Sequence, residues 1–323
     1  MSADGAALGA RLRQRDPSAA PAALNLLEST APGDREQAAA LLGELSPAAL
    51  GGEAPGQVIG VTGPPGAGKS SLLSALLRAW REQRRSVAIL AVDPSSRRSG
   101  GSLLGDRARI EFDPGDREVF IRSTAAGERL GGLSWATRSA AQALAAAFEV
   151  VVIETVGVGQ AETGVAEVAD TVAVVVQPGG GDVLQFLKSG IMEIPDVLVV
   201  TKADLGQIAL SARRDLNAAL RSLGRRSTWT VAVSSVAPPT GIDELMQGFA
   251  QHWNELTADD GRLLAERRRQ ARRAAALTDF QVEYGERGLR ALGGRRAAQS
   301  LLAEQDPTLA VPALVAVLER GHA

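Results

Sequence analysis

The sequence predicts an α/β fold in which a mostly parallel sheet has helices on both faces. Between residues 58 and 253, apolar runs of strand length alternate with helix-like segments, a pattern typical of parallel sheets wrapped by helices. The runs are almost continuous in Val and Ile, which indicates strands buried on both sides. A glycine-rich turn between the first run and the first helix is the setting of a phosphate-binding loop. The predicted strands cover residues 58–61, 87–92, 119–121, 150–153, 172–176, 197–200 and 229–233.

Composition and charge limit the classes of function. The chain has 323 residues, 45% of them hydrophobic, which supplies a core for one large domain with appendages or for two small ones. Its formal net charge of −2 argues against a nucleic-acid-binding protein held by bulk electrostatics. With no Cys and two His, the sequence excludes disulfides and thiolate metal sites. No apolar run reaches membrane-spanning length and no signal peptide is recognisable, so we expect a cytoplasmic protein without a membrane partner.

The N-terminal part, residues 1–55, is predicted to be helical. Apolar residues recur at helical spacing over 22–28 and 34–45, and the stop at 29–33 is followed by Asp34 as a capping residue. We expect these two helices to pack on the core, and the stretch 51–56 to lead into the first strand. The predicted organisation is a helical segment at 1–55, a sheet-containing domain at 56–256 and a helical region at 257–323.

A phosphate-binding loop is predicted after the first strand. Gly63, four further residues, then Gly68, Lys69 and Ser70 match the pattern G-x-x-x-x-G-K-[ST] in full. Glycine at these positions lets backbone N–H groups curl around a phosphate without obstruction by side chains. Lys69 is expected to bridge the outer phosphates during catalysis, and the Ser70 hydroxyl to hold a magnesium ion. The predicted contacts of this loop are Gly63, Pro64, Pro65, Gly66, Ala67, Gly68, Lys69, Ser70 and Ser71.

Acidic residues follow two other predicted strands. Asp93 ends the second strand and Asp106 lies in the next loop, and both are candidate magnesium ligands, directly or through water, or alternatively loop caps. Glu154 starts an acid-x-x-Gly turn that reaches Gly157, the arrangement with which nucleotide hydrolases sense the third phosphate. Glu154 is expected beside the metal or orienting the attacking water, and the Gly157 N–H at the terminal phosphate. A plain strand-to-loop acid is the alternative interpretation of Glu154.

The segments after the last two strands predict which base is bound. T-K-A-D at residues 201–204 is close to the N-K-x-D element that recognises guanine. The Asp204 carboxylate can accept two hydrogen bonds from the guanine N1–H and exocyclic amine, a pair that adenine does not offer, while the stem of Lys202 lies along the ring. Because these fragments occur in order at successive strand ends, we predict GTP and GDP with Mg²⁺ as ligands, in preference to ATP. The last loop is expected to contribute Ser234, Ser235 and Val236.

These residues carry a resemblance to a known family. The chain resembles the MeaB/ArgK-type GTPases, which are G-protein chaperones of adenosylcobalamin-dependent acyl-CoA mutases such as methylmalonyl-CoA mutase. The resemblance covers residues 22–256, and its most specific part is the run E-T-V-G-V-G-Q at 154–160. Further matching runs are L-N-L-L-E-S at 24–29, A-V-D-P-S-S at 91–96, G-G-S-L-L-G-D-R at 100–107 and G-D-V-L-Q at 181–185.

The resemblance implies a fold, a function and partners. It implies a P-loop NTPase of the SIMIBI-like G-domain type with a C-terminal helical dimerisation arm. It implies that GTP hydrolysis, coupled to moving switch loops, gates adenosylcobalamin delivery to the mutase and protects or reactivates it. The implied partners are the mutase, the cobalamin adenosyltransferase and a second copy of the chain in a homodimer. Carried over by position, it implies nucleotide contacts from the phosphate loop, Lys202, Asp204 and residues 234–236, and magnesium contacts from Asp93, Asp106 and Glu154.

The sequence departs from the family pattern in several places. Thr201 stands where the family has Asn, which removes a side-chain amide near the base, so we expect lower guanine affinity with selectivity kept by Asp204. Residues 124–129, T-A-A-G-E-R, differ from the family's M-A-T-R-G, and the displaced Arg129 is given no contact. Val158 stands where fast small GTPases have a water-orienting Gln. We therefore predict slow intrinsic hydrolysis that a partner accelerates.

The glycine-rich segment 178–190 is a candidate contact for that partner. Each Gly loses much backbone entropy on ordering, so the loop is expected to be mobile when unbound. It follows a core strand and comes next after the acid-x-x-Gly turn, which suits a segment that transmits the nucleotide state. Asp182 and Lys188 are the side chains expected to make the contact. A surface loop without a partner is the alternative.

The tail is predicted as helices over 262–278, 280–292, 297–304 and 309–320. Six arginines between 262 and 273 make the first helix basic, and in an acidic chain we interpret it as solvated or facing another subunit. The apolar residues of the tail exceed what a short detached segment buries alone, which favours dimerisation. These residues are Leu289, Leu292, Leu301, Leu302, Leu314, Val315 and Leu318.

Two other functions fit part of the sequence. A nickel-delivery GTPase shares the phosphate loop and a chaperone role, but without Cys or a His cluster the chain offers no soft ligands for nickel. A small-molecule P-loop kinase would prefer ATP and need a basic lid over its substrate. Comparing GTP with ATP binding separates the kinase from the GTPases, and metal bound after purification separates the nickel-delivery protein.

Overall fold

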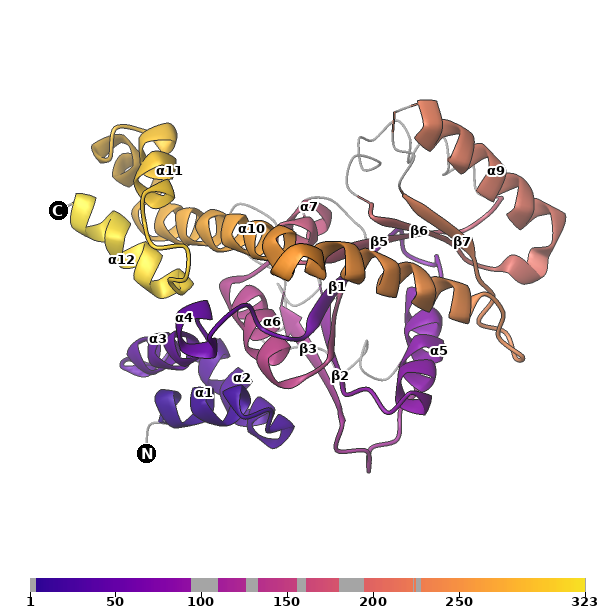
Figure 1. Cartoon of the computed structure of the whole chain (residues 1–323), viewed down its shortest axis with the longest axis horizontal. Coiled ribbons are helices and arrows are strands. Elements are labelled where there is room, and N and C mark those ends of the chain that lie inside the picture. The colour runs from indigo at the N-terminus through magenta and orange to yellow at the C-terminus, as the bar shows by residue number, and fades with distance from the viewer. Residues whose placement is uncertain are drawn as a thin grey trace.

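A seven-stranded parallel sheet forms the centre of the protein in the computed structural model (Figure 1). The structure describes residues 4–93, 110–125, 133–155, 161–179, 195–222, 224 and 228–322. The strand order is β3-β2-β4-β1-β5-β6-β7, and every neighbouring pair is parallel. All seven predicted strands are present, so the predicted α/β class is confirmed. They are β1 (Gln57–Thr62), β2 (Val87–Asp93), β3 (Val119–Ala125), β4 (Val150–Thr155), β5 (Thr171–Val176), β6 (Val197–Val200) and β7 (Trp229–Ala232).

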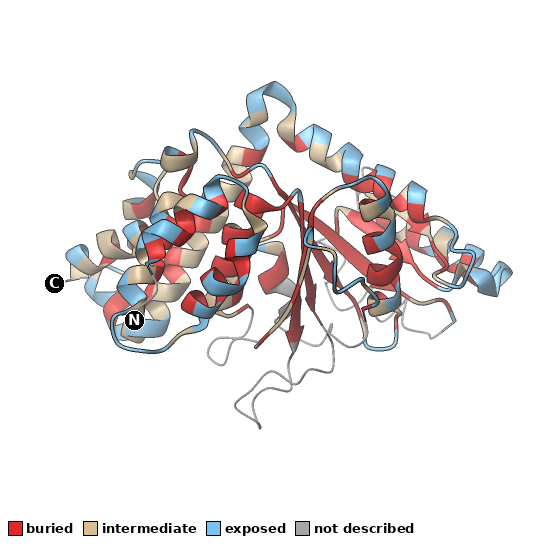
Figure 2. Ribbon diagram, turned by 90° about the horizontal axis from the view of Figure 1, so that it is seen from below, coloured by how far each residue is buried: buried red, intermediate tan, exposed pale blue. Residues whose placement is uncertain are grey.

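Alternate strand residues face two separate apolar cores. Val58 belongs to the core that also contains α6 (Trp135–Ala147), α7 (Ala161–Ala166) and α9 (Gln207–Ser222). Ile59 belongs to the core shared with α5 (Lys69–Glu82) and the first turns of α10 (Ile242–Ala291). The strands β1, β4, β5 and β6 are buried along their whole length, as the red ribbons of Figure 2 show, which confirms the prediction of strands covered on both sides. The edge strand β7 is mostly half-buried.

The N-terminal part contains α1 (Gly5–Arg13), α2 (Ala20–Glu28), α3 (Asp34–Glu44) and the short α4 (Pro47–Leu50). The predictions of α2 and α3 are confirmed, but α3 is capped by Gly33, and Asp34 is its first residue. The helix α1 was not predicted. It approaches α3 through Gly5 and Gly9, because a Cβ at Gly5 would lie 1.8 Å from the Gln37 carbonyl oxygen. A helix that packs through glycines carries little apolar periodicity.

The C-terminal part forms a third core of its own, from the second half of α10 with α11 (Arg295–Ala303) and α12 (Val311–His322). Phe280, Leu289, Leu302, Leu314 and Leu318 are all buried there. The expectation that the apolar residues of the tail need a second copy to cover them is therefore wrong for Leu289, Leu302, Leu314 and Leu318, which their own chain buries. The predicted helix boundary near residue 279 is also wrong, because Phe280 lies inside α10, which is interrupted instead at Gly285.

The helix α10 is interrupted a second time at residues 258–261. Asp259, Asp260 and Gly261 have φ angles of 51°, 57° and 71°, so three consecutive residues are left-handed. The regular segment that follows begins at Arg262, as predicted from the sequence. The first segment, which contains Leu245 and Phe249, packs on the sheet, and the later one reaches the third core.

The basic segment of α10 faces its own chain, so its interpretation as a solvated or subunit-facing helix is wrong for three arginines. Arg268 pairs with Asp170 at 2.6 Å, Arg272 with Glu53 at 2.9 Å and Arg267 with Asp196 at 3.1 Å. The three acids lie just before β5, β1 and β6, at the starting edge of the sheet. Among the described residues, no helix combines the length and apolar character that a bilayer crossing requires.

Candidate nucleotide-binding site

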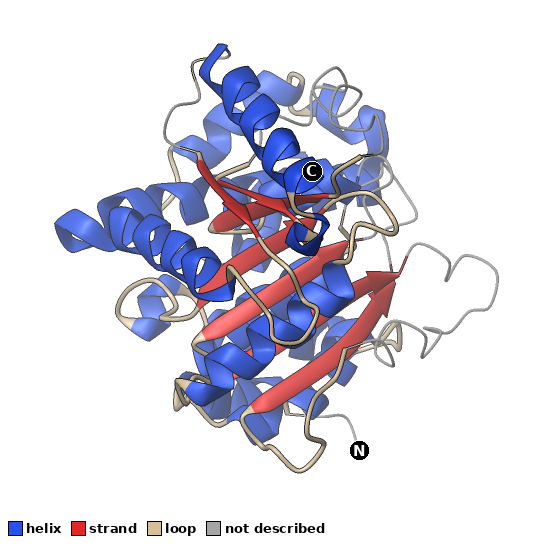
Figure 3. Cartoon of the chain, turned by 90° about the vertical axis from the view of Figure 1, so that its right-hand side faces the viewer, coloured by secondary structure: helices blue, strands red, loops and turns tan. Residues whose placement is uncertain are grey.

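The predicted site residues follow the carboxyl ends of the parallel strands, and Figure 3 shows the strand arrowheads directed to one edge of the sheet. Because β1 pairs with β4, Val61 lies opposite Glu154, which places that acid beside the start of the phosphate loop. Val200 of β6 lies opposite Ala232 of β7, so the loops that follow these two strands start side by side. In open parallel sheets this edge is where ligands bind.

The phosphate loop has the backbone that its glycines predict. Gly63, Gly66 and Gly68 have φ angles of 148°, 78° and 87°. A Cβ at Gly63 would lie 2.0 Å from the Val175 carbonyl oxygen, so glycine is required where the loop passes β5. The helix α5 begins at Lys69, directly after the loop. Its first backbone N–H groups and its dipole suit an anion at this position.

Lys69 is buried and held by the loop that it follows. Its ammonium group donates hydrogen bonds to the carbonyl oxygens of Gly63, at 2.7 Å, and Pro64, at 3.1 Å. An ammonium has three protons and a flexible stem, so it can exchange a carbonyl for a phosphate oxygen without leaving the loop. The side chain is therefore positioned for the bridging role that the sequence predicts.

The oxygen groups near the loop fit a magnesium ion. Ser70 lies in the first turn of α5 and is half-buried, and Glu154 is 5% exposed at the end of β4. Hydroxyl and carboxylate oxygens, completed by water, are the ligands that Mg²⁺ prefers. The hydroxyls of Thr62 and Thr155, which end β1 and β4, are buried without a hydrogen-bond partner among the described residues. The side chain of Asp93, and residues Asp106 and Gly157, lie outside the described residues.

The loops after β6 and β7 bring Asp204 and Ser234 together. The Ser234 hydroxyl donates to Asp204 Oδ1 at 2.6 Å, and the Ala203 N–H donates to the Val233 carbonyl at 3.0 Å. Asp204 is exposed, so its carboxylate is open to a ligand as well as to Ser234. The Val236 N–H donates to the Ser234 hydroxyl at 3.2 Å. The two loops therefore form one hydrogen-bonded unit.

Two residues of this unit, Lys202 and Thr201, make contacts that the sequence did not predict. Lys202, which has a left-handed φ of 55°, donates from its ammonium to the Gln177 side-chain oxygen at 2.5 Å. Thr201 is buried, and its hydroxyl lies 2.6 Å from the Ala67 carbonyl oxygen of the phosphate loop. Both partners are more than 20 residues away in the chain. Local motif spacing therefore carries no signal for them.

Comparison with known proteins identifies the family. The model of the methylmalonyl-CoA mutase-associated GTPase MeaB family matches residues 20–284. This chain belongs to the MeaB family. The family assignment made from the motifs is thereby confirmed, and with it the prediction that the protein is a GTPase, an enzyme that hydrolyses GTP.

Individual relatives agree with membership of the MeaB family. A probable GTPase of Mycobacterium tuberculosis is 41% identical over 257 residues, which are 77% of this chain and 75% of the relative. The mitochondrial methylmalonic aciduria type A homolog of Mus musculus is 37% identical over 64% of this chain and 50% of its own length. The crystal structure of the LAO/AO transport system kinase is 29% identical, covers 98% of this chain and 96% of its own, and has a TM-score of 0.67.

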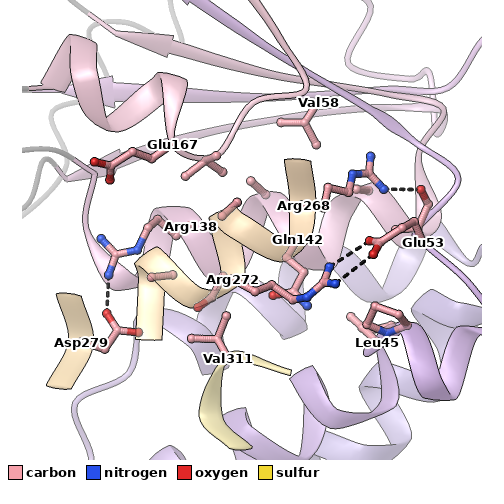
Figure 4. Close-up of a pocket in the computed structure, with 18 residues that line it drawn as sticks. Leu45, Glu53, Val58, Arg138, Gln142, Glu167, Arg268, Arg272, Asp279 and Val311 are labelled. Atoms are coloured by element: carbon pink, nitrogen blue, oxygen red, sulfur yellow. Dashed lines mark hydrogen bonds and ion pairs between the residues drawn. The ribbon is translucent and has the colours of Figure 1, made fainter. Parts of the chain in front are cut away.

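A separate cavity lies away from the nucleotide-binding edge of this MeaB-family protein. It has a volume of about 90 Å³ and lies between α6, α10 and the segment before β1 (Figure 4). In it Arg138 pairs with Asp279, and Arg272 with Glu53. Burial raises the pKa of Asp279 above its usual value, while Arg138 opposes the shift. None of the predicted nucleotide contacts lines this cavity, which belongs to the junction of the three parts of the chain.

Proposed function

We propose that this GTPase gates adenosylcobalamin delivery to a B12-dependent acyl-CoA mutase, methylmalonyl-CoA mutase or a relative, and protects or reactivates that enzyme. The observation that carries the proposal is the match over residues 20–284 to a family described as mutase-associated. The mouse relative is named for methylmalonic aciduria, and this name supports a link to methylmalonyl metabolism. In this proposal the cobalamin adenosyltransferase is a second partner.

The nucleotide site proposed for this function uses the predicted edge of the sheet. The glycines and the start of α5 receive the phosphates, and Lys69 compensates their charge. Ser70 and Glu154, with Asp93 and Asp106, would hold Mg²⁺, which supplies charge neutralisation on the phosphate oxygens when bound. Asp204, oriented by Ser234, reads the guanine edge, and Lys202 covers the ring.

We infer three further properties of the protein, which concern its hydrolysis rate, its contact with the mutase and its oligomeric state. Hydrolysis is slow without a partner, because Val158 provides no amide to orient water. Asp182 and Lys188, which like Val158 lie outside the described residues, contact the mutase. The protein works as a homodimer, with residues 1–55, 56–256 and 257–323 as its N-terminal segment, G domain and dimerisation region.

Titration calorimetry tests the nucleotide site. We expect GTP and GDP to bind and ATP to bind at least about 100-fold more weakly, since one base offers Asp204 two donors and the other none. Asp204→Ala should remove most of this preference, and Lys69→Ala should weaken every nucleotide. Asp215→Ala is a matched control, because Asp215 is exposed on α9. Equal affinity for GTP and ATP in the wild-type protein would contradict the site.

Reconstitution with a purified adenosylcobalamin-dependent methylmalonyl-CoA mutase tests the partner. We expect the affinity of the two proteins to differ between GDP and a non-hydrolysable GTP analogue, and mutase inactivation during turnover to slow when GTP is present. Lys69→Ala should remove the effect of GTP without preventing association. If affinity and inactivation rate are the same with every nucleotide, the proposed coupling is absent, whatever the calorimetry shows.

A kinase is the second candidate function, because one solved structure, which covers 98% of this chain, is named a transport system kinase. The same calorimetry separates it from the GTPase, since a kinase of this kind would prefer ATP. Transfer of labelled phosphate from ATP to a small molecule, at a rate above that of GTP hydrolysis, would favour the kinase.

A further inference from the structure

Thr201 is a buried polar side chain in the loop that carries the base-reading residues. It is 4% exposed, whereas its neighbours Lys202 and Asp204 are exposed. Its hydroxyl lies 2.6 Å from the carbonyl oxygen of Ala67 and 3.1 Å from that of Val176. One hydroxyl proton serves these two acceptors, and the shorter distance favours the bond to Ala67.

Both acceptors matter for the geometry of the site. Ala67 is the residue between the two left-handed glycines of the phosphate loop, Gly66 and Gly68, and it is fully buried. Val176 ends β5 and also accepts a hydrogen bond from the Thr201 backbone N–H at 2.9 Å. A Cβ at Gly68 would lie 4.0 Å from the Thr201 Cβ, so the side chain packs directly against the loop. Thr201 therefore connects the phosphate loop to the end of a central strand.

The loop after β6 thus divides its contacts between two directions. Lys202 turns outward at a left-handed φ of 55°, and Asp204 is held by Ser234. Thr201 points inward, and its hydroxyl contacts two main-chain carbonyls. A side chain in this position acts on the shape of the phosphate loop.

We propose that Thr201 is a positioning residue that fixes the phosphate loop and takes no part in choosing the base. This inference rests on the proposed nucleotide site and changes one expectation, that Thr in place of Asn weakens the guanine contacts. A loop held in its binding conformation loses less entropy when a phosphate is bound. Loss of the hydroxyl leaves a buried carbonyl of Ala67 without this donor, which weakens the loop itself. The phosphates are common to all nucleotides, so the effect is independent of the base.

The test compares Thr201→Val, which keeps the shape and removes the hydroxyl, with Thr201→Ser, which keeps the hydroxyl. The probes are GDP and inosine diphosphate. Inosine diphosphate differs from GDP only in lacking the exocyclic amine, which would donate a hydrogen bond to Asp204. Thr201→Val should weaken both nucleotides by the same factor, about five- to tenfold, as expected for one hydrogen bond. Thr201→Ser should bind both within about twofold of the wild-type protein, since its hydroxyl can make the same bond.

The ratio of the two affinities decides between positioning and base reading. Asp204→Ala should lower the preference for GDP over inosine diphosphate, and Thr201→Val should leave it unchanged. A changed ratio in Thr201→Val, or unchanged affinity for both nucleotides, overturns the proposal. If Lys69→Ala also binds GDP normally, the proposed nucleotide site fails. If Lys69→Ala abolishes binding while Thr201→Val has no effect, only the role of Thr201 fails.

A general loss of structure is separated from positioning by a third variant and a second measurement. The Cys side chain in Thr201→Cys has a volume similar to that of Thr but is only a weak hydrogen-bond donor. The nucleotide affinity of this variant should therefore lie between those of Thr201→Ser and Thr201→Val. Thermal unfolding without nucleotide measures the stability of each variant. If the Thr201→Val protein does not fold, wild-type affinity in the Thr201→Cys protein overturns the proposal, and an intermediate loss of affinity common to both nucleotides supports it.

Discussion

Gly63 is the position where one added methyl group tests the phosphate loop most directly. Its φ is 148°, and a Cβ there would lie 2.0 Å from a main-chain oxygen of β5. We predict that Gly63→Ala lowers the free energy of unfolding by more than about 3 kcal/mol, since backbone on both sides must move. Gly66 is the matched control: its φ is 78°, and no atom of the described residues would lie within 4 Å of a Cβ there.

Gly66→Ala should cost only the strain of a left-handed residue, about 1 kcal/mol. Denaturation in urea, with both variants free of nucleotide, measures the difference. Equal losses for the two substitutions would show that contact with β5 does not determine the need for glycine at residue 63.

His252, which is not part of a metal-binding motif, is expected to contribute to the pH dependence of folding stability. Its Nδ1 lies 2.9 Å from the Thr171 hydroxyl, and burial lowers its pKa below 6.5, with Asp196 opposing and Arg267 reinforcing the shift. The unfolded chain binds this proton more readily than the folded one, so stability falls as pH decreases below about 6.5. His252→Asn should remove the part of this stability loss that comes from proton binding to His252. Parallel slopes for wild-type and His252→Asn proteins between pH 6.5 and 5.5 would contradict this.

How well the role of each residue can be predicted depends on how far apart in the sequence its contacts lie. Lys69 and Asp204 belong to short motifs whose spacing defines their place, so the sequence could indicate them. The hydroxyl of Thr201 contacts the phosphate loop and His252 contacts β5, at separations of 134 and 81 residues. No local pattern records such a contact, and the sequence predicts the motif but not its internal support.

Arg268 holds the basic segment of α10 to the starting edge of the sheet. Its guanidinium donates to Asp170 at 2.8 and 2.6 Å and to the Ala54 and Gly56 carbonyls. Burial by itself lowers the pKa of Arg268, but the charge of Asp170, the hydrogen bonds to it and the charge of Glu53 together raise that pKa above its usual value. Asp170 is 1% exposed and also accepts from the Val58 N–H at 2.8 Å, so its charge has no access to bulk water.

We predict that Arg268→Met lowers the free energy of unfolding by about 3–5 kcal/mol, because it leaves a buried carboxylate without its cation. Adding Asp170→Asn should recover part of the loss, since the amide keeps the acceptor for Val58 without a charge. Arg269→Met is the control, because the side chains of the Arg269–Glu266 pair are 34% and 41% exposed, and a pair so open to solvent is worth at most about 1 kcal/mol. Chemical denaturation of the four proteins measures this, and equal effects of Arg268→Met and Arg269→Met would exclude a supporting role for the buried pair.

The interruption of α10 predicts a stabilising substitution. Asp260 has a φ of 57°, which costs a residue with a side chain about 1 kcal/mol, and Gly removes this strain. Asp260→Gly should therefore raise the free energy of unfolding by a few tenths to about 1 kcal/mol, after the greater entropy of the unfolded glycine chain is deducted. Asp243→Gly, in the first turn of the same helix, should lower it. A loss of stability in both variants would mean that residue 260 is helical in solution.

The elements were predicted as well as their local patterns allowed. The seven strands were found because buried parallel strands are nearly continuous in Val and Ile. The helix α1 was missed because glycines form its contact with α3. The arginines of α10 were assigned to solvent because charge runs usually face water, and their acids lie 71 to 219 residues away.

Ion pairs join the three parts of the chain into one molecule. Glu53, before β1, pairs with Arg272 of α10, and Arg138 of α6 pairs with Asp279 near the third core. Arg122 of β3 pairs with Glu28 of α2. The division of the sequence into these three parts stays a prediction. Each pair spans at least 94 residues, so local patterns in the sequence do not predict how the parts are joined. The nucleotide edge and the third core are therefore connected through α10 and the start of the sheet.

This arrangement predicts that the third core can be weakened without loss of the nucleotide site. Phe280 is fully buried with Leu302 and Leu318, in a cluster distinct from the two that flank the sheet. Phe280→Ala should cost about 3–5 kcal/mol locally and increase hydrogen exchange in peptides from residues 276–318. GDP affinity should stay within about twofold, because the phosphate loop rests on β5 and on α5 in another core.

Leu245→Ala is the matched substitution in the core beside α5, where Leu245 is also fully buried. It should weaken GDP binding and increase exchange around the phosphate loop, while peptides from 276–318 keep their protection. If Phe280→Ala instead increases exchange in the phosphate loop as strongly as in its own region, the cores unfold as one unit. In that case nucleotide binding would stabilise the C-terminal helices by the same free energy as the sheet, since a ligand that binds only the folded state stabilises the whole cooperative unit.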